Sequence, residues 1–161
     1  MGVIKYNNYM MKIIQDDLTH PDVQSLIAMH VTDMDVHSPQ DSSYTLDLTE
    51  LQHEKITVWT IWEDSRLLGC GALHELAPHW AEVKSMRTHP DHLRKGIAAK
   101  MMDHIMTVAD QRGYTKLSLE TGTTPAYDPA LKLYRKYGFK NGEVFADYRE
   151  SPFNQFLHLD I

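Results

Sequence analysis

The sequence predicts an α/β fold: a mixed, mainly antiparallel sheet of about seven strands with helices on both faces. The clearest evidence is a strand-like run over 80–88, a helical apolar repeat from about Gly96 to Gly113, and a second strand-like run over 116–121. Strand, helix and strand in this order form a parallel crossover unit. With 161 residues, 42% hydrophobic and 24% charged, the chain fits a single domain over 1–161.

A β-hairpin precedes this unit. Residues 57–62 and 67–76 are rich in β-branched and aromatic side chains and flank a turn at Asp64 and Ser65. Ahead of the hairpin we expect a loose extension over 1–10 and a strand over 11–17. A helix over 21–35 follows, with Val23, Leu26, Ile27 and His30 on one face. Between this helix and the hairpin we expect a polar loop from His37 to Tyr44 and a short helix or turn over 46–51.

A second helix follows the crossover unit. It opens at Asp128 and Pro129, a capping residue and a first-turn proline, and it closes at Gly138. Two further strands are predicted over Phe145–Arg149 and Asn154–Ile161.

The segment 89–100, from His89 to Lys100, joins the strand of the crossover unit to its helix and predicts an anion site. Backbone N–H groups in the first turn of a helix have no intrahelical acceptor and lie at the positive end of the helix dipole. Gly96 permits close approach to the backbone, and Arg94 and Lys95 add positive charge. Taken alone, the segment is equally consistent with an ordinary basic turn.

The composition excludes several classes of function. A formal charge of −6 argues against general nucleic-acid binding, and no apolar run is long enough for a membrane span or a secretory signal. One cysteine, Cys70, excludes an internal disulfide framework, so a reducing cytoplasm is expected. Of the ten histidines only His89 and His92 have ligand-like spacing, and they lie in the anion loop, so no metal is expected.

Two motifs resemble the GNAT superfamily of acetyl-CoA-dependent N-acetyltransferases. The pyrophosphate loop of that family, Q/R-x-x-G-x-G/A, reads Leu93-Arg-Lys-Gly-Ile-Ala98, with Leu93 in place of Gln or Arg. The second motif, N-x-x-A-x-x-L-Y-x-x-x-G-F, spans 127–139, with Tyr127 in place of Asn. The resemblance covers roughly residues 11–161.

The resemblance implies a site for acetyl-CoA as the acyl donor. In the family, backbone groups of the strand before the loop hold the pantetheine, and the loop amides hold the pyrophosphate. Carried onto this chain, the cofactor-binding residues are Met86, Thr88, Arg94, Lys95, Gly96, Ile97, Ala98 and Ala99.

The resemblance also implies two catalytic residues. Tyr134 matches a tyrosine that lies near the sulfur, and a phenol can deliver a proton to a thiolate; the alternative is a packing or positioning role. Glu82, four residues before Met86, matches the base of the histone-acetylating branch; a structural salt bridge with Lys84 is the alternative. Glu120, His74 and His79 are the other candidate bases.

The predicted reaction transfers acetyl to a primary amine of a small molecule or peptide. We expect His37, Ser38 and His74 to contact this acceptor, because the loop after His37 is long enough to cover the site. A CoA-binding regulatory or structural module without catalysis is the alternative. The sequence leaves open whether the protein forms a homodimer. Other nucleotide-binding classes lack their glycine-rich motifs here.

Overall fold

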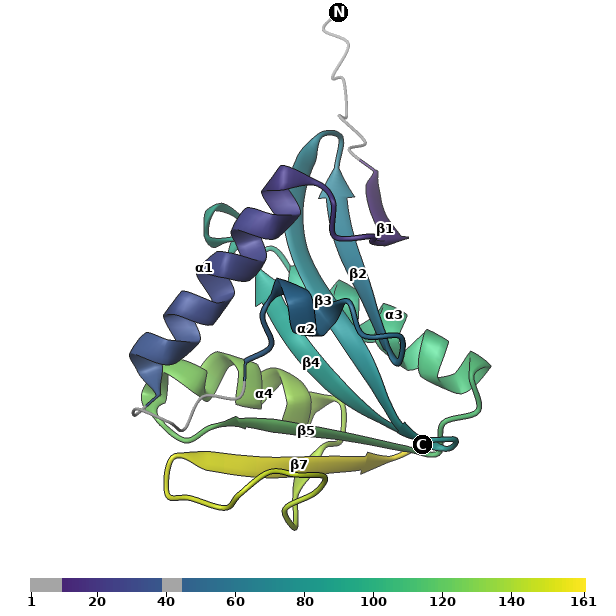
Figure 1. Ribbon diagram of the computed structural model, residues 1–161, viewed down its shortest axis with the longest axis vertical. Coiled ribbons are helices and arrows are strands. Elements are labelled where there is room, and N and C mark those ends of the chain that lie inside the picture. Colours follow the sequence, from purple (N-terminus) through teal and green to yellow (C-terminus); the bar gives the residue numbers. More distant parts are fainter. Residues whose placement is uncertain (1–9, 39–44) are drawn as a thin grey trace, which may run out of the picture.

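A computed structural model describes residues 10–38 and 45–161 and shows a seven-stranded sheet in the order β1-β2-β3-β4-β5-β7-β6 (Figure 1). The strands are β1 (Met11–Gln15), β2 (Ile56–Glu63), β3 (Arg66–Ala77), β4 (Trp80–Thr88), β5 (Lys116–Gly122), β6 (Lys140–Asn141) and β7 (Asn154–Asp160). The helices are α1 (Pro21–His37), α2 (Leu48–Leu51), α3 (Ile97–Gln111) and α4 (Asp128–Lys136), with short 3-10 turns η1 (Pro90–His92) and η2 (Pro125–Tyr127). Strands β4 and β5 are the one parallel pair in this part of the chain, which confirms the crossover unit and the predicted fold class.

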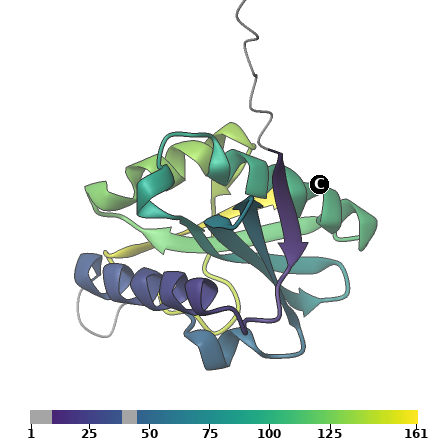
Figure 2. The same cartoon turned by 90° about the horizontal axis from the view of Figure 1, so that it is seen from above.

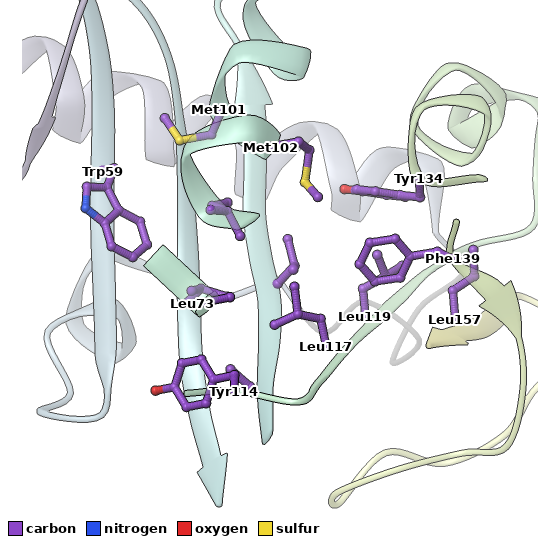
Figure 3. Packing of buried hydrophobic residues seen from close by; sticks show 14 of the residues in the cluster. Trp59, Leu73, Met101, Met102, Tyr114, Leu117, Leu119, Tyr134, Phe139 and Leu157 are labelled. Carbon is purple, nitrogen blue, oxygen red and sulfur yellow. The ribbon is translucent and has the colours of Figure 1, made fainter. Parts of the chain in front are cut away.

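The helices cover both faces of the sheet. Figure 2 shows α3 and α4 on one face and α1 and α2 on the other. Helix α3 buries Ile97, Met101, Met102 and Ile105 against the sheet, and each large apolar side chain contributes about 1.5–3 kcal/mol. Figure 3 shows this core continuing through Leu117 and Leu119 of β5 to Phe139 and Leu157. On the other face α1 buries Val23, Leu26, Ile27 and His30, the predicted set.

The sheet opens between β4 and β5. These strands pair only where Trp80, Ala81 and Glu82 face Lys116, Leu117 and Ser118. Beyond Glu82 the two strands diverge, as Figure 1 shows. Strand β5 instead pairs over its whole length with β7.

A β-bulge in β4 lies within this diverging part. The register with β3 shifts between Cys70, which pairs with Arg87, and Ala72, which pairs with Lys84. Ser85 takes a left-handed backbone conformation, φ 54°, and its carbonyl accepts a hydrogen bond from the Cys70 thiol over 3.3 Å. Such a bulge bends its strand and re-aims its side chains. The bulge therefore keeps Lys84 and Arg87 on the α1 face.

Two predictions of local structure are wrong. Residues 145–149 form no strand: Ala146 has φ 52°, and the segment is a loop before β7. Its aromatic content, read as strand character, reflects packing instead, since the Phe145 ring contacts Trp80, Phe156 and His158. His37 belongs to the last turn of α1, not to the loop that follows it.

Candidate active site

A cleft of about 860 Å³ occupies the opening between β4 and β5. One end is formed by the loop before α3, and the other lies beneath the C-terminal half of α1. The middle is lined by β4, β5 and α4. The residues that line the cleft include His30, Asp33, Met34, Ser38, Leu46, Glu82, Lys84, Ser85, Met86, Arg87, Thr88, Leu93, Arg94, Gly96, Ile97, Ala98, Ala99, Glu120, Gly122, Tyr127, Tyr134, Tyr148 and Phe153.

The loop before α3 has the backbone geometry of an anion cradle. Arg94 and Gly96 both have positive φ, 61° and 75°, and no side chain of the described residues caps α3. The N–H groups of the first turn of α3 therefore have neither an intrahelical nor a capping side-chain acceptor in the described part of the chain, and they can bind an anion. Of the predicted loop residues, Lys95 does not line the cleft; its ammonium lies 3.1 Å from the His92 ring. Leu93, 59% exposed, lines the entrance.

Met86 and Thr88 lie on the β4 edge that faces the opening. Because pairing with β5 ends at Glu82, the edge beyond that residue pairs with no strand of residues 10–38 and 45–161 on this side. Unpaired backbone groups on a strand edge can bind an extended amide-containing chain as an additional strand. The edge and the cradle thus follow one another along the cleft, as predicted.

Tyr134 lies at the middle of the cleft, on the α3–α4 side. Its ring packs edge-on against Phe139, and its hydroxyl is directed toward Met102 (Figure 3). Burial raises the pKa of Tyr134 above its usual range, and no hydrogen bond contributes to that shift. The phenol therefore stays protonated at physiological pH.

Glu82 is 2% exposed and is held by three polar side chains. Tyr148, from the loop before β7, donates its hydroxyl hydrogen bond to Glu82 Oε2. Lys84 Nζ donates to the same oxygen over 3.3 Å and to the Tyr148 hydroxyl. His74 Nδ1 lies 3.6 Å from Glu82 Oε1. Glu82 thus forms the salt bridge with Lys84 that was the alternative to a catalytic role.

Glu120 provides a second carboxylate in the cleft. It lies on β5, two residues beyond Ser118, the partner of Glu82, and accepts a hydrogen bond from Asn154 Nδ2 over 3.3 Å. Burial raises the pKa of Glu120 to about 7. The hydrogen bond from Asn154 and the positive charge of Lys84 lower this pKa, but their effect is smaller than that of burial. A carboxyl group with this pKa exchanges a proton near neutral pH.

The predicted acceptor residues are only partly brought together. Ser38 lines the cleft, whereas His37 is exposed and does not line it. His74 reaches the site through Glu82, and burial lowers its pKa. His79 bonds the Gly113 carbonyl outside the cleft. The rest of the loop, residues 39–44, lies outside the described residues.

Two site residues were not predicted. Tyr148 was assigned to a strand. The only signal in the sequence was the aromatic residues around it, which suggest that its ring packs against other rings. Arg87 lines the cleft with its side chain 16% exposed, and it donates a hydrogen bond to Asp33 of α1. Counting alternate residues along β4 from Glu82 and Lys84 puts Arg87 on the opposite face; the bulge reverses that.

Two further observations concern metal binding and membrane spans. Within residues 10–38 and 45–161 no group of three or more His, Cys, Asp or Glu side chains is arranged to hold a metal ion. The helices in these ranges are also too short or too polar to cross a membrane.

Two relatives are similar in sequence over most of the chain. The uncharacterized N-acetyltransferase YedL of Escherichia coli is 45% identical over 152 residues, 94% of this chain and 96% of that protein. The uncharacterized N-acetyltransferase YsnE of Bacillus subtilis is 47% identical over 147 residues, 91% and 97% of the two chains. These relatives do not favour a module without catalysis.

Solved structures show the same fold. A Klebsiella pneumoniae protein assigned to the acyl-CoA N-acyltransferases superposes with a TM-score of 0.78 at 25% identity, covering 95% of this chain and 99% of that one. A GNAT acetyltransferase from Elizabethkingia anophelis, solved with acetyl-CoA bound, gives a TM-score of 0.69 at 17% identity, covering 94% and 98%.

A model of the acetyltransferase (GNAT) family matches residues 23–139, a range that contains the opened β4–β5 pair, the anion cradle and the helix of Tyr134. The match spans most of the sheet and the donor side of the cleft. Together with the two relatives it establishes that the chain belongs to the GNAT family and is an N-acetyltransferase.

Proposed function

We propose that the enzyme transfers acetyl from acetyl-CoA to a primary amine of a small molecule or peptide. The observation that carries this proposal is the cleft itself, which joins an anion cradle, a strand edge that pairs with no described strand, the buried Glu82 and the half-buried Glu120 in one continuous space. The acetyl-CoA held by the Elizabethkingia protein supports the choice of donor.

The donor lies along the path from the cradle to Tyr134. The pyrophosphate accepts hydrogen bonds from the first-turn amides of Ile97, Ala98 and Ala99, with Arg94 adding charge. The pantetheine amides pair with the β4 edge at Met86 and Thr88. The thioester then lies between Tyr134 on one face of the sheet and Glu82 and Glu120 on the other.

In the reaction the amine nitrogen attacks the thioester carbonyl carbon, and the carbon–sulfur bond breaks. The nitrogen loses one proton to a carboxylate, and Tyr134 protonates the departing sulfur. Glu82 was the predicted base and stays a candidate. We favour Glu120, because Glu82 Oε2 already accepts from Lys84 and Tyr148, whereas the pKa of Glu120, about 7, suits proton uptake.

Matched variants test the proton acceptor. We expect purified wild type to acetylate amines with acetyl-CoA, with kcat/KM rising with pH through an apparent pKa near 7. Glu120→Gln should lower turnover about 10²-fold or more and remove that step, with partial recovery at high pH, where more amine is deprotonated. Glu82→Gln should lower turnover but keep the step. If the step disappears in Glu82→Gln and persists in Glu120→Gln, Glu82 is the base.

Two broader assignments accompany this proposal. We place the enzyme in a reducing cytoplasm, because its single cysteine, Cys70, is a buried free thiol and an internal disulfide framework is excluded. A homodimer stays a prediction, tested by sedimentation of the purified enzyme.

A further inference from the structure

Three polar atoms on the α1 side of the cleft have no hydrogen-bond partner among the residues that the structure describes. They are His30 Nδ1, Ser85 Oγ and Arg87 Nε, and all are shielded from solvent. Their three residues line the cleft, and His30 is 9% exposed. A buried polar group without a partner is destabilising, and a cluster of such groups beside a cleft indicates a missing ligand group.

Arg87 is the centre of this cluster. It follows the bulge of β4 and pairs with Cys70, which packs beneath α1, so its side chain extends to the α1 face. Asp33 occupies one terminal nitrogen of the guanidinium. Nε of the same guanidinium has no acceptor in the described part of the chain. A guanidinium has five N–H donors in a fixed fork, so the donors that Asp33 does not occupy can bind the two oxygens of a carboxylate.

We propose that the acceptor is a free amino acid, whose carboxylate binds Arg87 and the Ser85 hydroxyl while its amino group faces Glu82 and Glu120. This inference rests on the proposed amine acetylation and names its substrate class. Because Ser85 Oγ and Arg87 Nε are shielded in the structure, this binding requires Ser85 to rotate about χ1 and the Arg87 stem to shift. His30, held neutral because burial lowers its pKa to about 4, offers a further polar contact.

The charges of this region favour a ligand that carries both signs. Lys84 is paired with Glu82, and Arg87 with Asp33, so these two pairs carry no net charge, and Glu120 adds one negative charge when it is ionised. A free amino acid adds a carboxylate at the Arg87 end and an amino group at the carboxylate end, and so adds no net charge. A simple amine would leave the Arg87 fork unfilled. Met34, Leu46 and Phe153 give this side of the cleft apolar walls for a side chain.

The test compares amino acids with their own amides, which keep the amine and the side chain but remove the negative charge. A panel such as leucine and methionine, each with its amide, is assayed with acetyl-CoA, and each rate is expressed per unprotonated amine. We expect kcat/KM to be at least about tenfold higher for the acid, because hydrogen bonds to charged groups exceed neutral ones. Equal or better use of the amides overturns the proposal.

A binding measurement separates this inference from the proposed function. Calorimetric titration of leucine and leucinamide into the enzyme saturated with CoA reports recognition without turnover. Tighter binding of the acid supports the carboxylate site, whether or not acetyl is transferred. Absence of acetyl transfer to any amine would instead contradict the proposed function. Binding of both with equal affinity, or of neither, overturns the site.

Variants assign the preference to Arg87. Arg87→Gln should reduce the ratio of acid to amide kcat/KM toward one by lowering the value for the acid more than the value for the amide, whereas a purely structural role would lower both by the same factor. Arg87→Lys, which keeps the charge but loses the fork, should recover only part of the ratio. Arg112→Gln, whose side chain contacts Thr57 and Trp59 away from the cleft, is the control. An unchanged ratio in folded Arg87→Gln overturns the proposal.

Discussion

The hydroxyl oxygens of Ser38 and Tyr127 lie 2.7 Å apart and join the end of α1 to the turn before α4 at the mouth of the cleft. The Tyr127 ring rests directly on Gly122, the last residue of β5, where a Cβ atom would lie 2.1 Å from ring carbon Cε2. The family motif usually has Asn at the position of Tyr127. The change to Tyr is therefore accommodated by a glycine on one side and a hydrogen bond on the other.

Gly122→Ala should consequently be destabilising in this chain, by about 1–3 kcal/mol, because the ring is fixed at both ends and has no room to move. The same substitution in a Tyr127→Asn background should cost much less, since the smaller side chain removes the contact. Denaturant unfolding of the two single variants and the double variant measures this coupling. Additive losses would show that the ring yields to the new methyl group.

Gly96→Glu should abolish CoA binding in a folded protein, because it places a carboxylate at the proposed pyrophosphate site. Gly113→Glu is the matched control: both glycines have φ +75° with no atom within 4 Å of the position that a Cβ would take, so both variants carry the same left-handed strain of about 1–2 kcal/mol. Thermal unfolding should show similar losses, and calorimetric titration should show lost affinity only for Gly96→Glu. Equal CoA affinity in both would remove the loop from the site.

The sequence predicted those parts of the site that depend on local pattern. Gly96 ahead of an apolar repeat is sufficient to place the cradle, and the strand–helix–strand order is sufficient to place β5 beside β4. The opening beside Met86 and Thr88 was expected only from the family resemblance. Arg87 could not be placed, because a one-residue bulge at Ser85 reverses the face of every later side chain. Tyr148 reaches Glu82 through a long-range contact, which periodicity does not encode.

Tyr134→Phe should lower kcat about 10²-fold with little change in KM for acetyl-CoA, because it removes the proton donor and keeps the ring. Its stability should be close to that of wild type, because the substitution keeps the buried ring and its edge-on packing against Phe139. Tyr114→Phe is the control: Tyr114 belongs to the same core, but its hydroxyl donates to Glu75 outside the cleft. Unchanged kcat in Tyr134→Phe would reassign the residue to packing or positioning of the donor.

Glu120→Gln should make the protein more stable than wild type at pH 8 and leave it nearly equal at pH 4. The pKa of Glu120 is about 7 in the folded protein against a usual value of 4.5, so the folded state holds this proton more tightly than the unfolded state. That contribution is fully present below pH 4.5 and is lost as pH rises through 7, by at most about 3 kcal/mol. The neutral amide in the variant avoids the loss.

Thermal unfolding of wild type, Glu120→Gln and Glu54→Gln between pH 4 and pH 8 checks this expectation. Glu54 is exposed on the segment before β2, so its variant should follow the pH profile of wild type. In Glu120→Gln the curve should separate from that of wild type as the pH passes from about 5 to 8, in the direction of higher stability. Parallel curves for all three proteins would mean that Glu120 is ionised in the folded state at neutral pH without penalty, and the reason for preferring it to Glu82 as the base would be lost.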